Sequence, residues 1–185
     1  MAHRSLMPEG NGKWDGVVID KVLGKFGQPT DIPVVGDWSG TGSDKIGVYR
    51  QGYWYLDLNG NGVWDGTPAD RQCKLGQPAD LPVVGDWGVA GVDQIGVYRQ
   101  GYWYLDLNGN CIWDGTPTDR QVKFGQPGDL PVVGDWAGAG VDLLGLYRQG
   151  IWYLDLNGSG VWESGSDKQM GPFGQPGDVP VVGNW

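Results

Sequence analysis

The chain has 185 residues, of which 35 are glycine and 11 are tryptophan, and its formal net charge is −9. Aromatic residues make up 12% of the chain, which supplies enough apolar surface for a folded core and argues against disorder. An acidic surface repels phosphate backbones, and no apolar run approaches the roughly 20 residues of a membrane-spanning helix. We therefore expect no nucleic-acid partner and no membrane insertion.

The chain begins with a segment unlike the rest. Residues 1–9 lack the apolar stretch of a secretory signal and are expected to be a leader or expression-derived segment. The only histidine, His3, lies in it. Residues 10–185 are expected to form a single repeat domain.

An internal repeat of 49 residues dominates the sequence. The tripeptide Gly-Gln-Pro begins at Gly27, Gly76, Gly125 and Gly174. Each copy is followed by Pro-Val-Val-Gly-Asp-Trp, which becomes Pro-Val-Val-Gly-Asn-Trp in the last copy. A fixed period of this kind is typical of architectures in which each unit packs on its neighbours.

Within one repeat, the side chains alternate with a period of two, which indicates strands. In the first full repeat, the predicted strands are residues 33–37, 45–50, 53–57 and 70–75. The dipeptide at 51–52, Gln-Gly, predicts a hairpin between the second and third strands. No stretch has helical periodicity, so the expected fold class is all-β.

A repeat of about 40–50 residues that holds four short strands is typical of a β-propeller blade. One such sheet cannot bury both faces, so Trp38, Trp54 and Trp64 are predicted to fill the space between adjacent blades. We expect a β-propeller-like array of four-stranded blades. A β-solenoid is the alternative, although its coils usually repeat at about 20–30 residues. The expected divisions are a partial blade at 10–32, full blades at about 33–81, 82–130 and 131–179, and a final strand at 180–185.

Three full blades fall short of the four that known propellers need to close a ring. Unpaired sheet edges are open to partner strands, so we expect a homo-oligomer in which chains complete the ring together. The alternative is a piece of a longer array. The close similarity of the repeats also admits an engineered or recently amplified scaffold without a ligand.

The two cysteines fall at non-equivalent positions of the repeat. Cys73 corresponds to Val122, and Cys111 corresponds to Gly62 and Gly160. A disulfide framework would place cysteines at matched positions, so both are predicted to be unpaired.

The repeated motif resembles the FG-GAP/VCBS repeat family. The resembling run is Phe-Gly-Gln-Pro-x-Asp-x-Pro-Val-Val-Gly-Asp-Trp, then a Gly-rich loop and Ile-Gly-Val-Tyr-Arg, with copies beginning at Phe26, Leu75, Phe124 and Phe173. The resemblance implies calcium-binding propeller blades and an extracellular or cell-surface location. The family places Asp or Asn at alternate positions after Gly-Asp-Trp, whereas these loops hold mainly Gly and Ala there. We expect those loops to have lost the metal.

A second loop in each repeat carries oxygen ligands at calcium-binding spacing. Asp57, Asn59, Asn61, the carbonyl of Val63, and Asp65 follow the pattern D-x-N-x-N-G-x-x-D. The equivalent ligands in the next two repeats are Asp106, Asn108, Asn110, Ile112 (carbonyl) and Asp114, then Asp155, Asn157, Ser159, Val161 (carbonyl) and Glu163. We call residues 57–65, 106–114 and 155–163 the three Asp-Asn loops. With two carboxylates each, they are expected to bind calcium weakly, with a dissociation constant of about 10⁻⁴–10⁻³ M.

The alternative for these loops is a bare turn in which Asp and Asn side chains accept hydrogen bonds from local backbone amides. The loops should also differ in affinity. Cys111 stands at the glycine position of the second loop, where a side chain resists left-handed geometry. The third loop has Ser159 and the longer Glu163. The first loop is therefore expected to be the strongest site.

Aromatic residues could also stack on sugar rings, which makes a carbohydrate-binding lectin the main alternative function. The candidate residues are Tyr53, Tyr55, Tyr102, Tyr104 and Tyr153, with Arg50, Arg99 and Arg148 nearby in sequence. Aromatic residues that recur in every repeat also suit packing between blades.

Nothing in the sequence supports catalysis. No serine lies beside a plausible base, and near-identical repeats do not supply one asymmetric site. The expected function is a non-catalytic binding or structural module of an extracellular or cell-surface protein, whose blades are stiffened by weak calcium sites.

Overall fold

The computed structural model describes residues 5–6, 13, 21–87 and 91–183. These residues form strands and turns and contain no helix, so the expected all-β class is confirmed. No helix long and apolar enough to cross a membrane occurs in this part of the chain.

Three four-stranded antiparallel sheets follow one another along the chain. The first sheet contains β3 (Ile32–Gly36), β4 (Lys45–Arg50), β5 (Tyr53–Leu56) and β6 (Arg71–Lys74). The second contains β7 (Leu81–Gly85), β8 (Gln94–Arg99), β9 (Tyr102–Leu105) and β10 (Arg120–Lys123). The third contains β11 (Leu130–Gly134), β12 (Leu143–Arg148), β13 (Ile151–Leu154) and β14 (Lys168–Met170). In each sheet, every strand pairs with the next one in sequence, so the sheet is a simple meander.

The central hairpin of the first sheet forms at the predicted dipeptide. Gln51 and Gly52 both have positive φ, at 49° and 92°, and Arg50 pairs with Tyr53 across the turn. A Cβ atom on Gly52 would lie 2.7 Å from the carbonyl oxygen of Gly76. Glycine is therefore required here both by the backbone conformation and by the close approach of the next connection.

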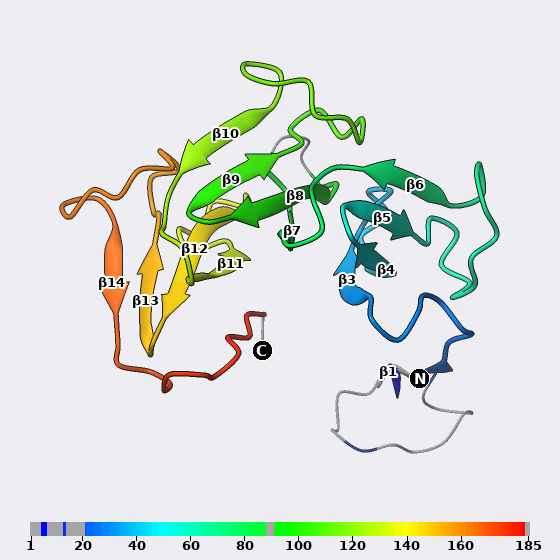
Figure 1. Ribbon diagram of the computed structural model, residues 1–185, viewed down its shortest axis with the longest axis horizontal. Coiled ribbons are helices and arrows are strands. Elements are labelled where there is room, and N and C mark those ends of the chain that lie inside the picture. Colours follow the sequence, from blue (N-terminus) through cyan, green and yellow to red (C-terminus); the bar gives the residue numbers. More distant parts are fainter. Residues whose placement is uncertain (1–4, 7–12, 14–20, 88–90, 184–185) are drawn as a thin grey trace.

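The three sheets fan out from their first strands (Figure 1). Strand β3 contacts β7, and β7 contacts β11, so the first strands lie side by side at the inner edge of the fan. The last strands, β6, β10 and β14, lie at the outer edge. The sheets make an open arc in the described part of the chain.

The hydrophobic core lies between successive sheets. Trp54 is 0% exposed. Together with Leu56 and Leu75 of the first repeat, it packs against Ile95 and Val97 of β8 in the second sheet. The indole Nε1 of Trp54 donates to the carbonyl oxygen of Leu75 at 2.8 Å. An equivalent cluster around Trp103 joins the second sheet to the third. Each sheet therefore depends on its neighbour for the burial of its large apolar side chains.

Two of the three tryptophans in the first repeat pack between the first and second sheets. Trp38 and Trp54 belong to the core between the first two sheets. Trp64 does not: it is half-buried and packs edge-on against Phe26 and Tyr55, at centroid distances of 6.1 and 5.3 Å. Trp64 lies on the opposite face of the sheet from Trp54, where it contacts Phe26 of the preceding repeat unit. The equivalent Trp162 lies 6.5 Å from Phe124, which belongs to the core between the second and third sheets. All three tryptophans of a repeat therefore contact a neighbouring unit.

Cys73 and Cys111 form a disulfide, so the prediction of two unpaired cysteines is wrong. Cys73 lies in β6 of the first sheet, and Cys111 lies in the loop after β9 of the second, with their Cα atoms 5.4 Å apart. The bridge crosses between sheets, so its two ends must occupy different positions of the repeat. The corresponding contact between the second and third sheets joins Val122 to Gly160, where a Cβ atom would lie 2.9 Å from that of Val122.

The ends of the predicted domain are only partly described. Strand β1 (Ser5–Leu6) pairs with β2 (Lys21–Val22), and most of the predicted leader and partial blade lies outside the described residues. Residues 180–183 of the expected final strand lie in no strand, and residues 184–185 are outside the described part. In the three full sheets the equivalent segment pairs with the strand that follows it in sequence.

Candidate functional site

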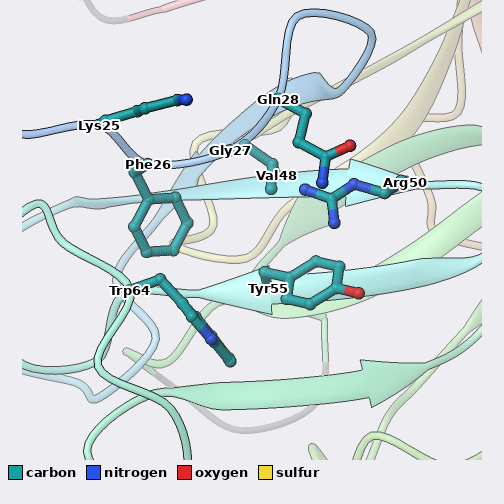
Figure 2. Close-up of a pocket in the computed structure, with 8 residues that line it drawn as sticks. All are labelled: Lys25, Phe26, Gly27, Gln28, Val48, Arg50, Tyr55 and Trp64. Carbon is teal, nitrogen blue, oxygen red and sulfur yellow. The ribbon is translucent and has the colours of Figure 1, made fainter.

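Two cavities of nearly identical composition recur along the chain. The first, of about 320 Å³, is lined by Lys25, Phe26, Gly27, Gln28, Val48, Arg50, Tyr55 and Trp64. The second, of about 300 Å³, is lined by Lys74, Leu75, Gly76, Gln77, Val97, Arg99, Tyr104 and Trp113. We call them the first and second grooves. Each is lined by the first residues of a Gly-Gln-Pro segment and by strands of a sheet. Figure 2 shows the first groove.

The alternation of side chains along each strand and the pairing between strands determine which residues form the floor of each groove. In the first groove, Val48 pairs directly with Tyr55, and Arg50 follows two residues after Val48, on the same face of β4. Gly27, with φ of 92°, lies so close above that a Cβ atom would be 2.9 Å from the side chain of Val48. A larger residue at position 27 would push the segment away from the sheet.

A buried carboxylate fixes each groove arginine. Nε and Nη2 of Arg50 donate to the two carboxylate oxygens of Asp31, both at 2.6 Å. The Arg50 side chain is 27% exposed, whereas that of Asp31 is only 2% exposed. Arg99 with Asp80 and Arg148 with Asp129 repeat this two-bond geometry. Such pairs hold the guanidinium in one orientation.

The pKa values of the first pair reflect this contact. The hydrogen bond with Asp31 raises the pKa of Arg50. Burial acts to raise the pKa of Asp31, but the hydrogen bond from Arg50 and that from the backbone amide of Gln28 outweigh burial and lower it. Both groups are therefore held in their charged forms at neutral pH.

Each groove arginine lies over a tyrosine ring. The guanidinium carbon of Arg50 is 4.7 Å from the ring centroid of Tyr55, and Figure 2 shows the Gln28 amide beside it. Trp64 contacts the same tyrosine at an interplanar angle of 81°. The equivalent stacks are Arg99, Tyr104 and Trp113, then Arg148, Tyr153 and Trp162. Arginine, tyrosine and tryptophan thus form a preorganised unit in all three sheets.

The structure divides the tyrosines that were predicted to bind sugar. Tyr55 and Tyr104 line the two grooves, and Tyr153 makes the same contacts in the third sheet. Tyr53 and Tyr102 are outside the groove linings, each over a third exposed and near a lysine ammonium at 5.4 and 5.5 Å. The sequence reasoning missed the lysines, the glutamines and the loop tryptophans. The signal available for them was their recurrence beside each Gly-Gln-Pro and each Asp-Asn loop.

The first Asp-Asn loop is closed by its own hydrogen bonds. Oδ2 of Asp57 accepts from the amide of Gly62 at 2.7 Å, and Oδ1 of Asn59 accepts from the amide of Asn61 at 2.9 Å. The side-chain nitrogens of Asn59 and Asn61 both donate to Oδ2 of Asp65, at 3.0 and 2.6 Å. Three polar side chains therefore converge on one side of the loop. The Val63 side chain is exposed, as are those of Ile112 and Val161.

The second loop keeps the same backbone despite its cysteine. Cys111 has a φ of 68°, and its amide donates to Oδ2 of Asp106 at 2.7 Å, as Gly62 does to Asp57. Cys111 thus adopts the left-handed conformation that was expected to be unfavourable, and the disulfide with Cys73 also constrains this residue. Asn108 and Asn110 both donate to Oδ2 of Asp114.

The third loop differs in its details. Oδ2 of Asp155 accepts from the amide of Gly160 at 2.7 Å, and the Asn157 amide donates to Oε2 of Glu163 at 2.6 Å. The hydroxyl of Ser159 donates to the carbonyl oxygen of Val161 at 3.1 Å. That carbonyl was a predicted calcium ligand, and here it accepts a bond within the loop.

One observation bears on whether a cation suits these loops. Oδ1 of Asp106 is buried and has no hydrogen-bond partner in the described part of the chain. Burial raises the pKa of Asp106 and the charge of Asp119 adds to this effect, whereas hydrogen bonds from the backbone amides of Cys111, Gly109 and Asn110 oppose it. A buried, unpaired carboxylate oxygen beside a second carboxylate is a position that a cation would stabilise. No group of three or more Asp, Glu, His or Cys converges among the described residues.

Comparisons with known proteins add no assignment. No protein-family model matches the chain, and neither a curated protein nor a solved structure matches it. The likeness to FG-GAP/VCBS repeats therefore rests on the repeated motif.

Proposed function

We propose that the protein is a non-catalytic module that binds carbohydrate in the grooves of its sheets, which we interpret as propeller blades. The observation that carries this proposal is the recurring unit of tryptophan, tyrosine and fixed arginine beside a glutamine amide. Sugars offer an apolar ring face and a set of hydroxyl groups. Aromatic rings suit the first, and oriented guanidinium and amide groups suit the second.

Repetition supports the proposal further. Each groove is small and open, so a single site is expected to bind weakly. Two or three similar sites on one chain bind a repeating polymer with greater avidity than any one of them. A polysaccharide is a repeating polymer, and recurrence of the same groove matches that property.

A binding screen tests this function. The full chain is applied to an array of oligosaccharides, and the positive sugars are titrated by tryptophan fluorescence. The triple substitution Trp64→Ala, Trp113→Ala and Trp162→Ala is expected to weaken binding at least tenfold. The double substitution Tyr53→Ala and Tyr102→Ala, outside the groove linings, is the control and should retain binding. Absence of binding to every sugar would remove the proposal.

The disulfide supports an extracellular or cell-surface location. Stable disulfides form in oxidising compartments and are rare in the cytosol. Cys73 and Cys111 join two sheets that already share a core, so the bond has a structural position.

Calcium binding by the Asp-Asn loops is a second proposal, favoured by the unpaired oxygen of Asp106. Millimolar calcium is expected to raise the melting temperature, and EDTA should reverse the change. Substituting Asp114→Asn removes one carboxylate from the second loop and should reduce the calcium effect. Identical melting curves with calcium and with EDTA would argue against the proposal.

Self-association is a third element of the proposed function. Phe173 is 78% exposed, whereas Leu75 and Phe124 at the equivalent positions are 2% exposed beneath the next sheet. The third sheet thus presents a face that each earlier sheet buries. A second copy of the chain could cover it and extend the arc toward a ring.

A further inference from the structure

We propose that the grooves select anionic carbohydrates, meaning sugar chains that carry carboxylate or sulfate groups. This inference rests on the carbohydrate function proposed above. The first groove is lined by Lys25 and Arg50, and the second by Lys74 and Arg99. No carboxylate is among the lining residues of either groove. On a chain with a net charge of −9, these grooves have the opposite sign from the protein as a whole.

The arginine pairs present their positive side to the ligand. The Arg99 side chain is 30% exposed, while its partner carboxylate on Asp80 is 1% exposed and lies beneath it. An approaching anion therefore meets the guanidinium first. Because Arg99 is already fixed by Asp80 and by the ring of Tyr104, binding an anion immobilises no further side chain there.

The lysines supply the net charge, because each arginine is paired with an aspartate. Lys74 ends β6 immediately before the Gly-Gln-Pro segment of the second groove, and its ammonium lies 5.4 Å from the ring of Tyr53. Lys123 takes the equivalent position before the third such segment, 5.5 Å from the ring of Tyr102. Lys74 lies among the lining residues of the second groove, and Lys123 takes the equivalent place in the next repeat. The groove tryptophan and the two cations together suit a charged sugar longer than one residue.

The experiment compares ligands with the same sugar backbone and different charge. Oligogalacturonate is titrated against its fully methyl-esterified form, and dextran sulfate oligomers against neutral dextran oligomers of the same length. We expect the carboxylated or the sulfated member to bind at least tenfold more tightly than its neutral counterpart, and its affinity to fall as ionic strength rises. The two pairs show which anionic group is preferred.

Variants assign the effect to the grooves. The triple substitution Lys25→Gln, Lys74→Gln and Lys123→Gln keeps the fold, since all three side chains are at the surface. It is expected to weaken anionic binding by about three- to tenfold per site, and to weaken anionic binding more than neutral binding. Lys168→Gln, an exposed lysine of β14 outside the grooves, is the control for the chemical change.

The outcomes separate the two proposals. If no sugar of either charge binds, the carbohydrate function itself fails. If neutral and anionic sugars bind equally, or the lysine variant binds anionic sugars normally, the anionic preference is overturned and the carbohydrate function stands. If a single-stranded oligonucleotide competes as well as the anionic sugar, the groove recognises negative charge and not sugar, and the inference is overturned.

Discussion

At the scale of single residues, the arginine–aspartate pairs combine stability and binding. Each places a carboxylate beneath a guanidinium, so that the same contact satisfies a buried charge and orients a groove side chain. Loss of the arginine should therefore affect both properties, whereas loss of a groove lysine should affect binding alone.

The first prediction concerns Arg99. Arg99→Met leaves Asp80, which is 2% exposed, without its cation, and should lower the free energy of unfolding by about 2 kcal/mol. Adding Asp80→Asn removes the stranded charge and should recover part of the loss. Urea denaturation of the single and double variants measures both effects. A double variant no more stable than Arg99→Met would show that the stranded charge of Asp80 does not cause the loss of stability.

The second prediction concerns pH. Burial raises the pKa of Asp142 above its ordinary value of 3.8, so the folded state binds this proton more readily than the unfolded chain. Asp142 therefore reduces stability at neutral pH, and this cost diminishes as the pH falls from 7 through the raised pKa toward about 4. Asp142→Asn keeps an acceptor oxygen for the amide of Asp86 and is expected to raise the melting temperature at pH 7 more than at pH 4.

Asp135 serves as a control of opposite sign. Backbone hydrogen bonds from Gly140 and Ala139 lower the pKa of Asp135, so its contribution is present above pH 3.8 and is lost at lower pH. Asp135→Asn should lower the melting temperature at pH 7 and have little effect in strong acid. Measurements are made in EDTA to exclude bound cations. Parallel pH profiles for the two variants would contradict the assignment.

At the scale of elements, the strands could be predicted from the sequence because alternation and turn chemistry are local. The hairpin at Gln51-Gly52 and the strands on either side follow from residues within one repeat. The position of Trp64 could not be predicted in this way, because a loop of irregular backbone decides which face of the sheet receives it. For the candidate grooves, the sequence identified the tyrosines but not the segment from Lys25 to Gln28. That segment lies beside Tyr55 only because successive repeat units pack together.

The disulfide shows the same limit. A comparison of equivalent repeat positions can reveal only cysteines that pair within one unit. This bond joins β6 of one sheet to a loop of the next. The Val122–Gly160 contact shows that this junction is close even without cysteines. Only a knowledge of which positions face each other across sheets would have predicted the pair.

The third prediction concerns this bond. It closes a loop of 38 residues, and its loss is expected to lower stability by about 2–4 kcal/mol. The double variant Cys73→Val and Cys111→Gly reproduces the natural Val122–Gly160 contact and should fold with that reduced stability. Calorimetry with and without a reductant is the measurement. The variant should not respond to the reductant, and a wild-type protein equally unresponsive would contradict the structural role of the bond.

At the scale of the whole molecule, the protein is an array in which each sheet is stabilised by the next. A hydrophobic core lies between the first and second sheets, and a second one lies between the second and third. The corresponding face of the third sheet is uncovered. Tyr147, like Tyr49 and Tyr98, donates its hydroxyl proton to the carbonyl oxygen of the following Gly-Gln-Pro glutamine, here Gln175 at 2.8 Å. The last segment is therefore attached to the third sheet while its apolar side chains are exposed.

The fourth prediction follows from that exposed face. The protein is expected to self-associate as its concentration rises, and Phe173→Ser should shift the equilibrium toward monomer without loss of strand content. Analytical ultracentrifugation over a range of concentrations, with circular dichroism as the control for folding, makes the measurement. A wild-type protein that is monomeric throughout would show that the face needs no partner copy.

The central claim is that sugar enters the grooves beside the loop tryptophans. The indole N–H resonances of the tryptophans, observed by nitrogen-15 NMR during a titration with an anionic oligosaccharide, test it most directly. We predict shifts for Trp64, Trp113 and Trp162, and none for Trp54 and Trp103, which are 0% exposed between sheets. Unchanged resonances for the three groove tryptophans in the presence of a sugar that binds would contradict the account.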